Sequence, residues 1–218
     1  MNYFKYGKAA VLHLQNKDKK LGRAIAVIGP LKRKVHMDLF SALINSIVGQ
    51  QISSKAQITI WQRIVSDLGE VTPAKVANCS IEDLQRYGMS FRKAAYIHNA
   101  AQHVLDKRLD INALQQLDDK RVCEELVKLD GVGIWTAEML MLFAMGRQDI
   151  LSFGDLAIVR GMRMLYRHKQ ITRPLFEKYR RRYSPYGSVA SLYLWAIAGG
   201  ALAGLSDTVK VKSKTKNP

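Results

Sequence analysis

A carboxylate beside an apolar run is the first feature of this sequence that could do chemistry. In LSFGDLAIVRGM, residues 151–162, Asp155 follows Gly154 and precedes the apolar residues LAIV. A carboxylate drawn partly out of water can stabilise a developing positive charge or orient a water molecule for attack. Asp155 could also be a helix N-cap that accepts an N–H from Ala157 or Ile158, and the two roles are compatible.

A glycine hairpin lies upstream, in LDGVGIWTAEML at residues 129–140. Gly131 and Gly133 separate two runs with helical spacing of apolar residues, 119–129 and 134–145. In such a helix–hairpin–helix, glycines let the backbone N–H groups at the start of the second helix approach a phosphate, and the helix dipole favours the anion. The alternative is a tight turn that packs two helices and binds nothing.

The charge balance favours a polyanionic partner. The 218 residues include 34 Lys and Arg against 18 Asp and Glu, which gives a net charge of +16. Nucleic acid is the leading candidate, and a membrane is disfavoured because no apolar run reaches the roughly 18 residues that span a bilayer. The first residues lack the pattern of a secretory signal, so we expect an intracellular protein, in the cytoplasm or nucleoid of a bacterium or the nucleus of a eukaryote. Two cysteines and scattered histidines show no metal-ligand spacing.

The element pattern predicts an all-α fold, because strand alternation is nowhere sustained. We expect eight to ten short helices, among them 38–48, one capped by Ser53, one opened by a capping box of Ser80 and Asp83, 91–105, and a last one opened by Ser184 and Pro185. A basic tail is expected over 206–218, and its polar end KVKSKTKNP, residues 210–218, is expected to be disordered.

These motifs together resemble the helix–hairpin–helix–Gly/Pro–Asp superfamily of DNA glycosylases, in its alkylpurine (3-methyladenine type II) branch. The likeness extends to GPLKRKVHMDLFSALINSIVGQQIS upstream and SPYGSVASLYLW downstream, and it covers roughly Asp18 to Gly204. It implies one glycosylase unit over 1–218 with two helical lobes, about 36–120 and about 1–35 with 121–205, and a base pocket in the cleft between them. It also implies the compact form without an N-terminal β-rich domain. The absence of a four-cysteine cluster separates the chain from the endonuclease III and adenine-mismatch branches.

The resemblance assigns roles to particular positions. Asp155 falls on the family's essential aspartate, and Gly131, Val132 and Gly133 fall on the hairpin that grips the DNA backbone. The carbonyls of Val127, Leu129 and Val132 fall where relatives hold a structural potassium or sodium ion. No cofactor is expected for catalysis.

The resemblance also assigns a role to the Gly-Gln-Gln loop, that of a wedge inserted into DNA. Gln51 falls where relatives insert a residue into the minor groove to fill the gap left by a flipped nucleotide, and Ser53 is expected to share that role. The alternative for Gln50 and Gln51 is a polar turn in which one of them bonds to backbone.

Trp135 decides the type of reaction. In bifunctional relatives this position holds a lysine that attacks the sugar, and an amine is required for that covalent route. From Leu129 to Val159 the only basic residue is Arg147, which cannot serve. In alkylpurine relatives a tryptophan here lines the base pocket, where its electron-rich face attracts a cationic base. The alternative is a core tryptophan at the joint between two helices.

Two further residues are assigned to the base pocket. Met139 stands one turn after Trp135, where some relatives have a tyrosine, and Tyr186 lies near another aromatic wall. Trp61 and Trp195 could also contribute, although both lie on helical stripes that are more typical of core residues.

The predicted function is therefore monofunctional excision of alkylated purines (3-methyladenine, 7-methylguanine) from double-stranded DNA, by base flipping and hydrolysis, by a monomer without lyase activity. The alternatives are a non-catalytic protein that recognises damaged or bent duplex through the same hairpin, and a glycosylase for deaminated purines such as hypoxanthine. The second alternative needs more acid catalysis than these residues offer.

Overall fold

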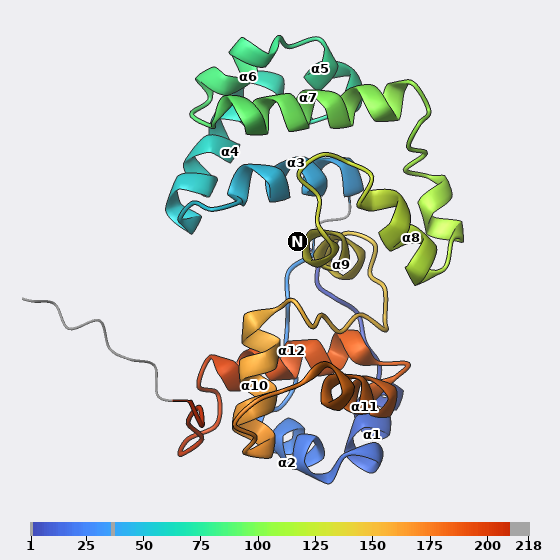
Figure 1. The fold of residues 1–218 in the computed structure, drawn as a ribbon, viewed down its shortest axis with the longest axis vertical. Helices are drawn as coiled ribbons and strands as arrows, with labels where there is room; N and C mark the ends of the chain where they lie inside the picture. The colour runs from blue at the N-terminus through green and yellow to red at the C-terminus, as the bar shows by residue number, and fades with distance from the viewer. Residues whose placement is uncertain (1, 36–37, 210–218) are drawn as a thin grey trace, which may run out of the picture. The chain divides into compact units, whose positions relative to one another are not determined.

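The computed structural model describes residues 2–35 and 38–209 (Figure 1). Residues 210–218, the part of the tail for which disorder was predicted, lie outside the described residues. The predicted all-α class is confirmed: the described residues form twelve α-helices and one 3₁₀ helix, and no β-strand. This is more than the eight to ten helices expected. No helix within the described ranges is long and apolar enough to cross a membrane.

The chain divides into two compact units. Unit 1 comprises Met1–Asn2 and Lys34–Arg147, and unit 2 comprises Tyr3–Arg33 and Gln148–Pro218. The division near residue 120 that we expected falls instead after Arg147. The hairpin stays with unit 1 because its second helix packs against the helix that precedes the Gln50–Gln51 loop.

Unit 1 contains the hairpin and the Gly-Gln-Gln loop. Its elements are α3 (Leu39–Gly49), α4 (Ser54–Leu68), α5 (Pro73–Ala77), α6 (Ile81–Arg86), α7 (Phe91–Leu105), η1 (Ala113–Gln116), α8 (Asp119–Leu126) and α9 (Ile134–Phe143).

The helices of unit 1 begin where the capping residues predict. The side chain of Ser53 accepts the N–H of Ala56 and caps α4, and Ser80 with Asp83 forms the predicted capping box of α6. The boundaries of α7 agree with the predicted 91–105. Helix α8 ends three residues earlier than expected, because the residues after Leu126 turn into the hairpin.

Unit 2 combines the first and last parts of the chain. Its helices are α1 (Lys8–Lys17), α2 (Lys19–Ile28), α10 (Leu156–Tyr166), α11 (Arg173–Tyr183) and α12 (Gly187–Ala198). The last helix begins at Gly187, slightly after the predicted start at Ser184–Pro185.

A glycine sets the closest packing in unit 2, between α10 and α12. A Cβ added at Gly161 would lie 2.2 Å from the carbonyl oxygen of Leu194, so only glycine allows this approach. The contact brings the end of α12 against α10, the helix that begins directly after Asp155.

Candidate functional site

Asp155 is a buried carboxylate at the N-terminus of α10. Its side chain is the helix N-cap, and the residue is only 7% exposed. Oδ1 accepts the N–H groups of both Ala157 and Ile158 at 2.9 Å, so both predicted capping bonds are present. The carboxylate therefore lies at the positive end of the α10 dipole. Capping holds the buried carboxylate in a fixed orientation at the start of α10.

Trp195 is a third donor to the same oxygen. Its indole Nε1 donates to Asp155 Oδ1 at 3.0 Å, and the guanidinium of Arg33 lies over its ring, 6.0 Å from the ring centroid. The sequence pattern favoured a core role for Trp195. The missed signal is the indole N–H, which usually finds a hydrogen-bond partner when it is buried. That the partner would be Asp155, forty positions away, follows from the close contact at Gly161.

Tyr186 does not lie at this carboxylate. It is the N-cap of α12, nine positions before Trp195, which corresponds to roughly 13 Å along a helix axis. Its ring packs edge-on against His13 of α1, with the ring centroids 5.2 Å apart. The structure therefore places Tyr186 at the end of α12 remote from Asp155, and its predicted role as a pocket wall receives no support from its contacts.

The two glycines of the hairpin in unit 1 differ in backbone conformation and in the space available for a side chain. Gly131 has φ +78°, and a Cβ there would lie 2.4 Å from the ring of Tyr96. Gly133 has φ −88° and ψ 172° as the extended N-cap of α9, and a Cβ there would meet nothing within 4 Å. Only Gly131 is required by the fold.

Gly133 leaves open space in front of the first turn of α9. No side chain caps this helix, so its first amides lack the N-cap bond that most helices of unit 1 have. A helix N-terminus with uncapped amides and no Cβ in front of it is suited to a phosphate.

The two glutamines of the loop between α3 and α4 point to different partners. Gln50 Nε2 donates to the carbonyl oxygen of Gly131 at 2.7 Å, which is the backbone-bonding role that the sequence left open. Gln51 is exposed and has φ +56°, an uncommon conformation for a residue other than glycine. The loop thus turns Gln50 towards the hairpin and presents Gln51 to solvent.

Trp135 is exposed on the first turn of α9. It is 47% exposed, and its neighbour Ile134 is 65% exposed. These values exclude a core position for Trp135. Met139 is half-buried one turn later on the same face of the helix. The two residues predicted to line a base pocket therefore share one face of α9.

Arg147 is engaged elsewhere in unit 1. Its Nη2 donates to the carbonyl oxygen of Leu114 at 2.9 Å, and its Nη1 lies 3.4 Å from Asp119. This geometry agrees with the expectation that Arg147 takes no part in the reaction.

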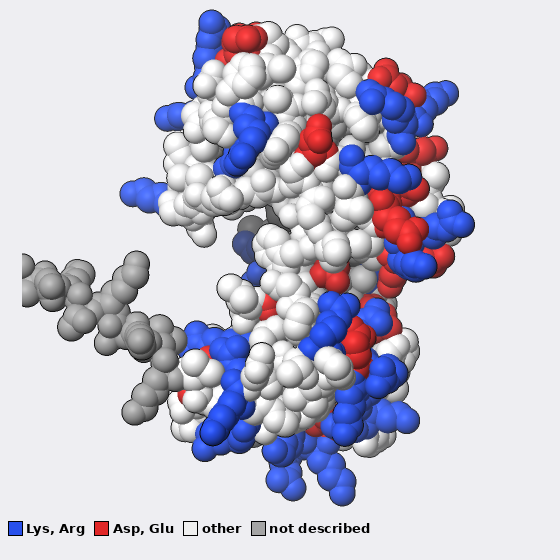
Figure 2. Space-filling model, in the orientation of Figure 1, with Lys and Arg blue, Asp and Glu red and all other residues white. Residues whose placement is uncertain are grey.

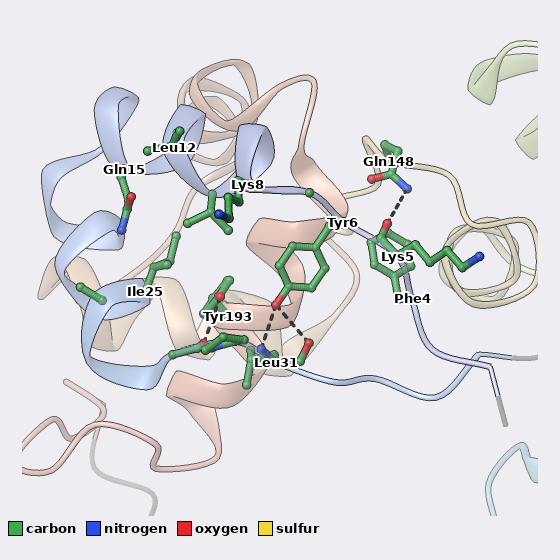
Figure 3. Close-up of a pocket in the computed structure, with 15 residues that line it drawn as sticks. Phe4, Lys5, Tyr6, Lys8, Leu12, Gln15, Ile25, Leu31, Gln148 and Tyr193 are labelled. Carbon is green, nitrogen blue, oxygen red and sulfur yellow. Dashed lines mark hydrogen bonds between the residues drawn. The ribbon is translucent and has the colours of Figure 1, made fainter.

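A cavity of about 910 Å³ lies in unit 2, away from Asp155 (Figure 3). It is lined by the segment before α1, by α1 and α2, by the residues directly after α2, and by Gln148 and Tyr193. The Tyr6 hydroxyl donates to Leu31 O at 3.0 Å, and that of Tyr193 donates to Gly29 O at 3.1 Å. Neither Asp155 nor Trp195 lines this cavity.

Basic side chains gather over unit 2 on the face shown in Figure 2. Helix α2 begins with Lys19 and Lys20, and the last turn of α11 holds Arg180, Arg181 and Arg182. Over α8 in unit 1, by contrast, basic and acidic side chains alternate. A concentrated positive field attracts a polyanion.

The chain matches the HhH-GPD superfamily of base excision DNA repair proteins over residues 44–185. It therefore belongs to this superfamily, as the hairpin and the Gly-Asp motif predicted, and the match includes the hairpin, Gln51 and Asp155.

Within this superfamily, the chain is similar to solved structures and sequences of 3-methyladenine DNA glycosylases. A DNA-3-methyladenine glycosidase from Bacillus halodurans is 35% identical, with a TM-score of 0.83 over 92% of this chain and 94% of that chain. The 3-methyladenine DNA glycosylase of Schizosaccharomyces pombe, solved in complex with abasic DNA, is 28% identical, with a TM-score of 0.75 over 86% and 95% of the two chains. The DNA-3-methyladenine glycosylase of Saccharomyces cerevisiae is 28% identical over 74% of this chain and 67% of its own length.

Proposed function

We propose that this protein is a monofunctional DNA glycosylase that removes alkylated purines, of the 3-methyladenine and 7-methylguanine type, from double-stranded DNA. The observation that carries the proposal is the Asp155 carboxylate, buried and held by three donors on one oxygen. The relatives named above, which are 3-methyladenine glycosylases, support the substrate class.

The reaction would use the charge of the substrate. Alkylation at N3 or N7 makes the purine cationic and a good leaving group. The bond between C1′ and the base breaks with its electron pair going to the base, which becomes neutral. Asp155 would stabilise the resulting oxocarbenium-like sugar and orient the water whose oxygen bonds to C1′ and whose proton passes to solvent. A preorganised carboxylate of this kind contributes about 3 kcal/mol or more.

Unit 1 would bind and distort the duplex. The first amides of α9 would bind a phosphate through the open space at Gly133, and Gln51, with Ser53 beside it, would fill the gap left by the flipped nucleotide. The exposed ring of Trp135 would stack on the cationic base, with Met139 next to it.

An alkali cation bound at the hairpin would add to the binding of the DNA phosphate. The carbonyl oxygens of Val127, Leu129 and Val132 are hard donors of the kind that such ions prefer. Leu129 O already accepts the N–H of Val132 at 3.1 Å, but a carbonyl has a second lone pair for an ion. Weaker DNA binding in lithium than in potassium or sodium at equal ionic strength would support this site, and equal binding would count against it.

The deciding experiment compares wild-type protein with Asp155→Asn on methylated duplex DNA at low salt. Free 3-methyladenine or 7-methylguanine should be released by the wild type only, with abasic sites revealed by alkali, while both proteins bind the duplex. Tight binding without release by the wild type would identify a damage-recognition protein. Loss of binding together with release in Asp155→Asn would mean that Asp155 is architectural.

The absence of lyase chemistry has its own test. With Trp135 in the lysine position, sodium borohydride should trap no covalent adduct between the wild-type protein and DNA, and Trp135→Lys alone should not create one, because an attacking lysine also needs a lowered pKa and correct aim. A trapped wild-type adduct would overturn the monofunctional proposal.

A further inference from the structure

A lysine of α7 holds the loop that carries Gln51. We call residues 49–53 the wedge loop. Lys93 Nζ donates to Val48 O at 2.8 Å and to Gln50 O at 2.5 Å. These carbonyls lie at the C-terminal end of α3, where the helix dipole is negative and a cation is favoured. Lys93 is half-buried, and desolvation lowers its pKa from the ordinary lysine value, so these two bonds offset a real cost of burial.

The same face of α7 also contacts the hairpin. Tyr96 lies three positions after Lys93, and its ring fills the space where Gly131 has no side chain. Gln50 joins the wedge loop directly to the hairpin, because its Nε2 donates to Gly131 O at 2.7 Å. The wedge loop, the hairpin and α7 therefore each contact the other two. In Figure 1, α7 runs alongside α3, and the turn between α8 and α9 reaches the level of α3, within unit 1.

The conformation of the wedge loop needs such support. Gln51 has φ +56°, which costs a residue with a side chain on the order of 1 kcal/mol. On the other side of the loop, Gln57 donates to Asn45 O at 3.0 Å and occupies the space beside Gly49, where a Cβ would lie 2.5 Å from its amide carbon. The loop is thus held from α4 and from α7, and only Gln51 and its exposed neighbours face solvent.

We propose that Lys93 is a positioning residue that fixes the wedge loop to the hairpin, so that Gln51 and the hairpin amides meet the duplex as one preformed element. This inference rests on the proposed function, because it takes the duplex as the ligand of both elements. Preformed geometry lowers the ordering cost of binding, so the effect of Lys93 on DNA passes through Gln51.

A duplex that contains no base to excise tests this role without catalysis. The probe carries a tetrahydrofuran abasic analogue next to 2-aminopurine, whose fluorescence reports insertion of a side chain into the gap. Lys93→Met should reduce the fluorescence change at saturating protein and weaken binding about fivefold to tenfold, which corresponds to the net contribution of about one hydrogen bond. Lys93→Arg should recover part of both.

The chain offers a matched control. Lys75 Nζ donates to Leu68 O at 2.7 Å at the C-terminal end of α4, in the same unit, but it makes no link to the hairpin. Lys75→Met should leave the fluorescence change and the affinity as in the wild type.

A double-mutant comparison separates positioning from general stability. In a Gln51→Ala background, Lys93→Met should have little further effect, because the residue that it positions is gone. Independent, multiplying effects of the two changes would overturn the proposal, as would wild-type fluorescence and affinity in Lys93→Met, or a wild-type protein that leaves the probe unchanged.

Gln50→Leu provides a second route if Lys93→Met does not fold. It removes the bond to Gly131 and keeps Lys93, and it should reduce the fluorescence change in the same way; a wild-type response would overturn the proposed link. A protein that inserts Gln51 into this probe but releases no methylated base would refute the glycosylase proposal and leave the role of Lys93 standing.

Discussion

At the scale of single residues, the site depends on how many donors one carboxylate oxygen accepts. Three N–H groups converge on Asp155 Oδ1, and two of them belong to the backbone, so only the indole of Trp195 can be removed by mutation. The direction of the carboxylate is set largely by α10 itself, and Trp195 adds a lateral restraint.

Trp195→Phe should therefore slow excision without abolishing it. Loss of one hydrogen bond to a charged group, about 1.4 kcal/mol, corresponds to about a tenfold lower single-turnover rate at saturating DNA. Tyr87→Phe, which removes a hydrogen bond to Asp67 in unit 1, is the control and should excise at the wild-type rate. If Trp195→Phe also excised at that rate, the indole would have no positioning role.

The hairpin glycines give a second prediction at this scale. Gly131→Ala should lower the free energy of unfolding by about 2 kcal/mol or more, because it forces a side chain into a left-handed conformation and against Tyr96. Gly133→Ala meets no atom and should keep the thermal stability of the wild type, while weakening DNA binding several-fold. Measurements of thermal melting and of duplex affinity on both variants check this, and an unchanged affinity in Gly133→Ala would exclude phosphate binding there.

At the scale of elements, α10 carries Asp155 at one end and anchors the C-terminal segment along its length. Arg163 donates to both oxygens of Asp207, at 3.0 and 2.6 Å, and Arg160 lies 3.7 Å away. The Asp207 side chain is 8% exposed, and hydrogen bonding from Arg163 holds its pKa below the ordinary value.

This ion pair predicts a pH dependence of stability. Since the pKa of Asp207 is lower in the folded state, its contribution is complete above the unfolded value of about 4 and is lost as the pH falls through the folded value. Asp207→Asn should reduce the free energy of unfolding by about 1 kcal/mol at neutral pH, with a difference that shrinks below about pH 4. Urea unfolding across this range is the measurement.

Asp106→Asn serves as the control for that series, because the ion pair of Asp106 with Arg108 is on the surface, with both side chains 53% exposed. It should show no comparable change. Equal behaviour of the two variants would mean that the Arg163–Asp207 pair does not anchor the segment.

The helices differed in how well their sequences predicted them, and the reasons are physical. Helix α7 has an N-cap at Ser90 and a regular apolar stripe, and its boundaries were correct. Helices α1, α2 and α11 were not predicted. In α11, basic residues surround a narrow buried face of Phe176, Tyr179 and Tyr183, and this face becomes recognisable only when the rest of unit 2 packs on it.

In the candidate site, local contacts were likewise predictable from the sequence and long-range contacts were not. Capping of α10 by Asp155 was predictable because it is local. The bond from Trp195 and the bond from Gln50 to Gly131 join positions 40 and 81 residues apart, and no periodicity contains them. The distance of Tyr186 from Asp155 was not predictable either, because the sequence does not show which end of α12 lies near Asp155.

At the scale of the whole molecule, the net charge of +16 predicts steep salt dependence. Neutralising several phosphates releases counterions, so duplex affinity should fall by about a thousandfold between roughly 50 and 200 mM salt. The slope should be the same for undamaged and methylated duplex, because the contacts that produce it lie on the backbone. A flat response in a titration series would rule out phosphate contacts as the main source of affinity.

The division of the chain into two units has a consequence for folding during synthesis on the ribosome. Unit 1 is almost entirely one continuous stretch, Lys34–Arg147, whereas unit 2 needs both Tyr3–Arg33 and the residues from Gln148 onward. Helices α1 and α2 are therefore made first and must wait, with their apolar faces uncovered, until α10 to α12 emerge. In the nascent protein, the proposed DNA-binding elements of unit 1 would fold before the part of unit 2 that holds Asp155. Stalled chains that end after Arg147 should accordingly show a protease-resistant core from unit 1 while α1 and α2 are still cleaved.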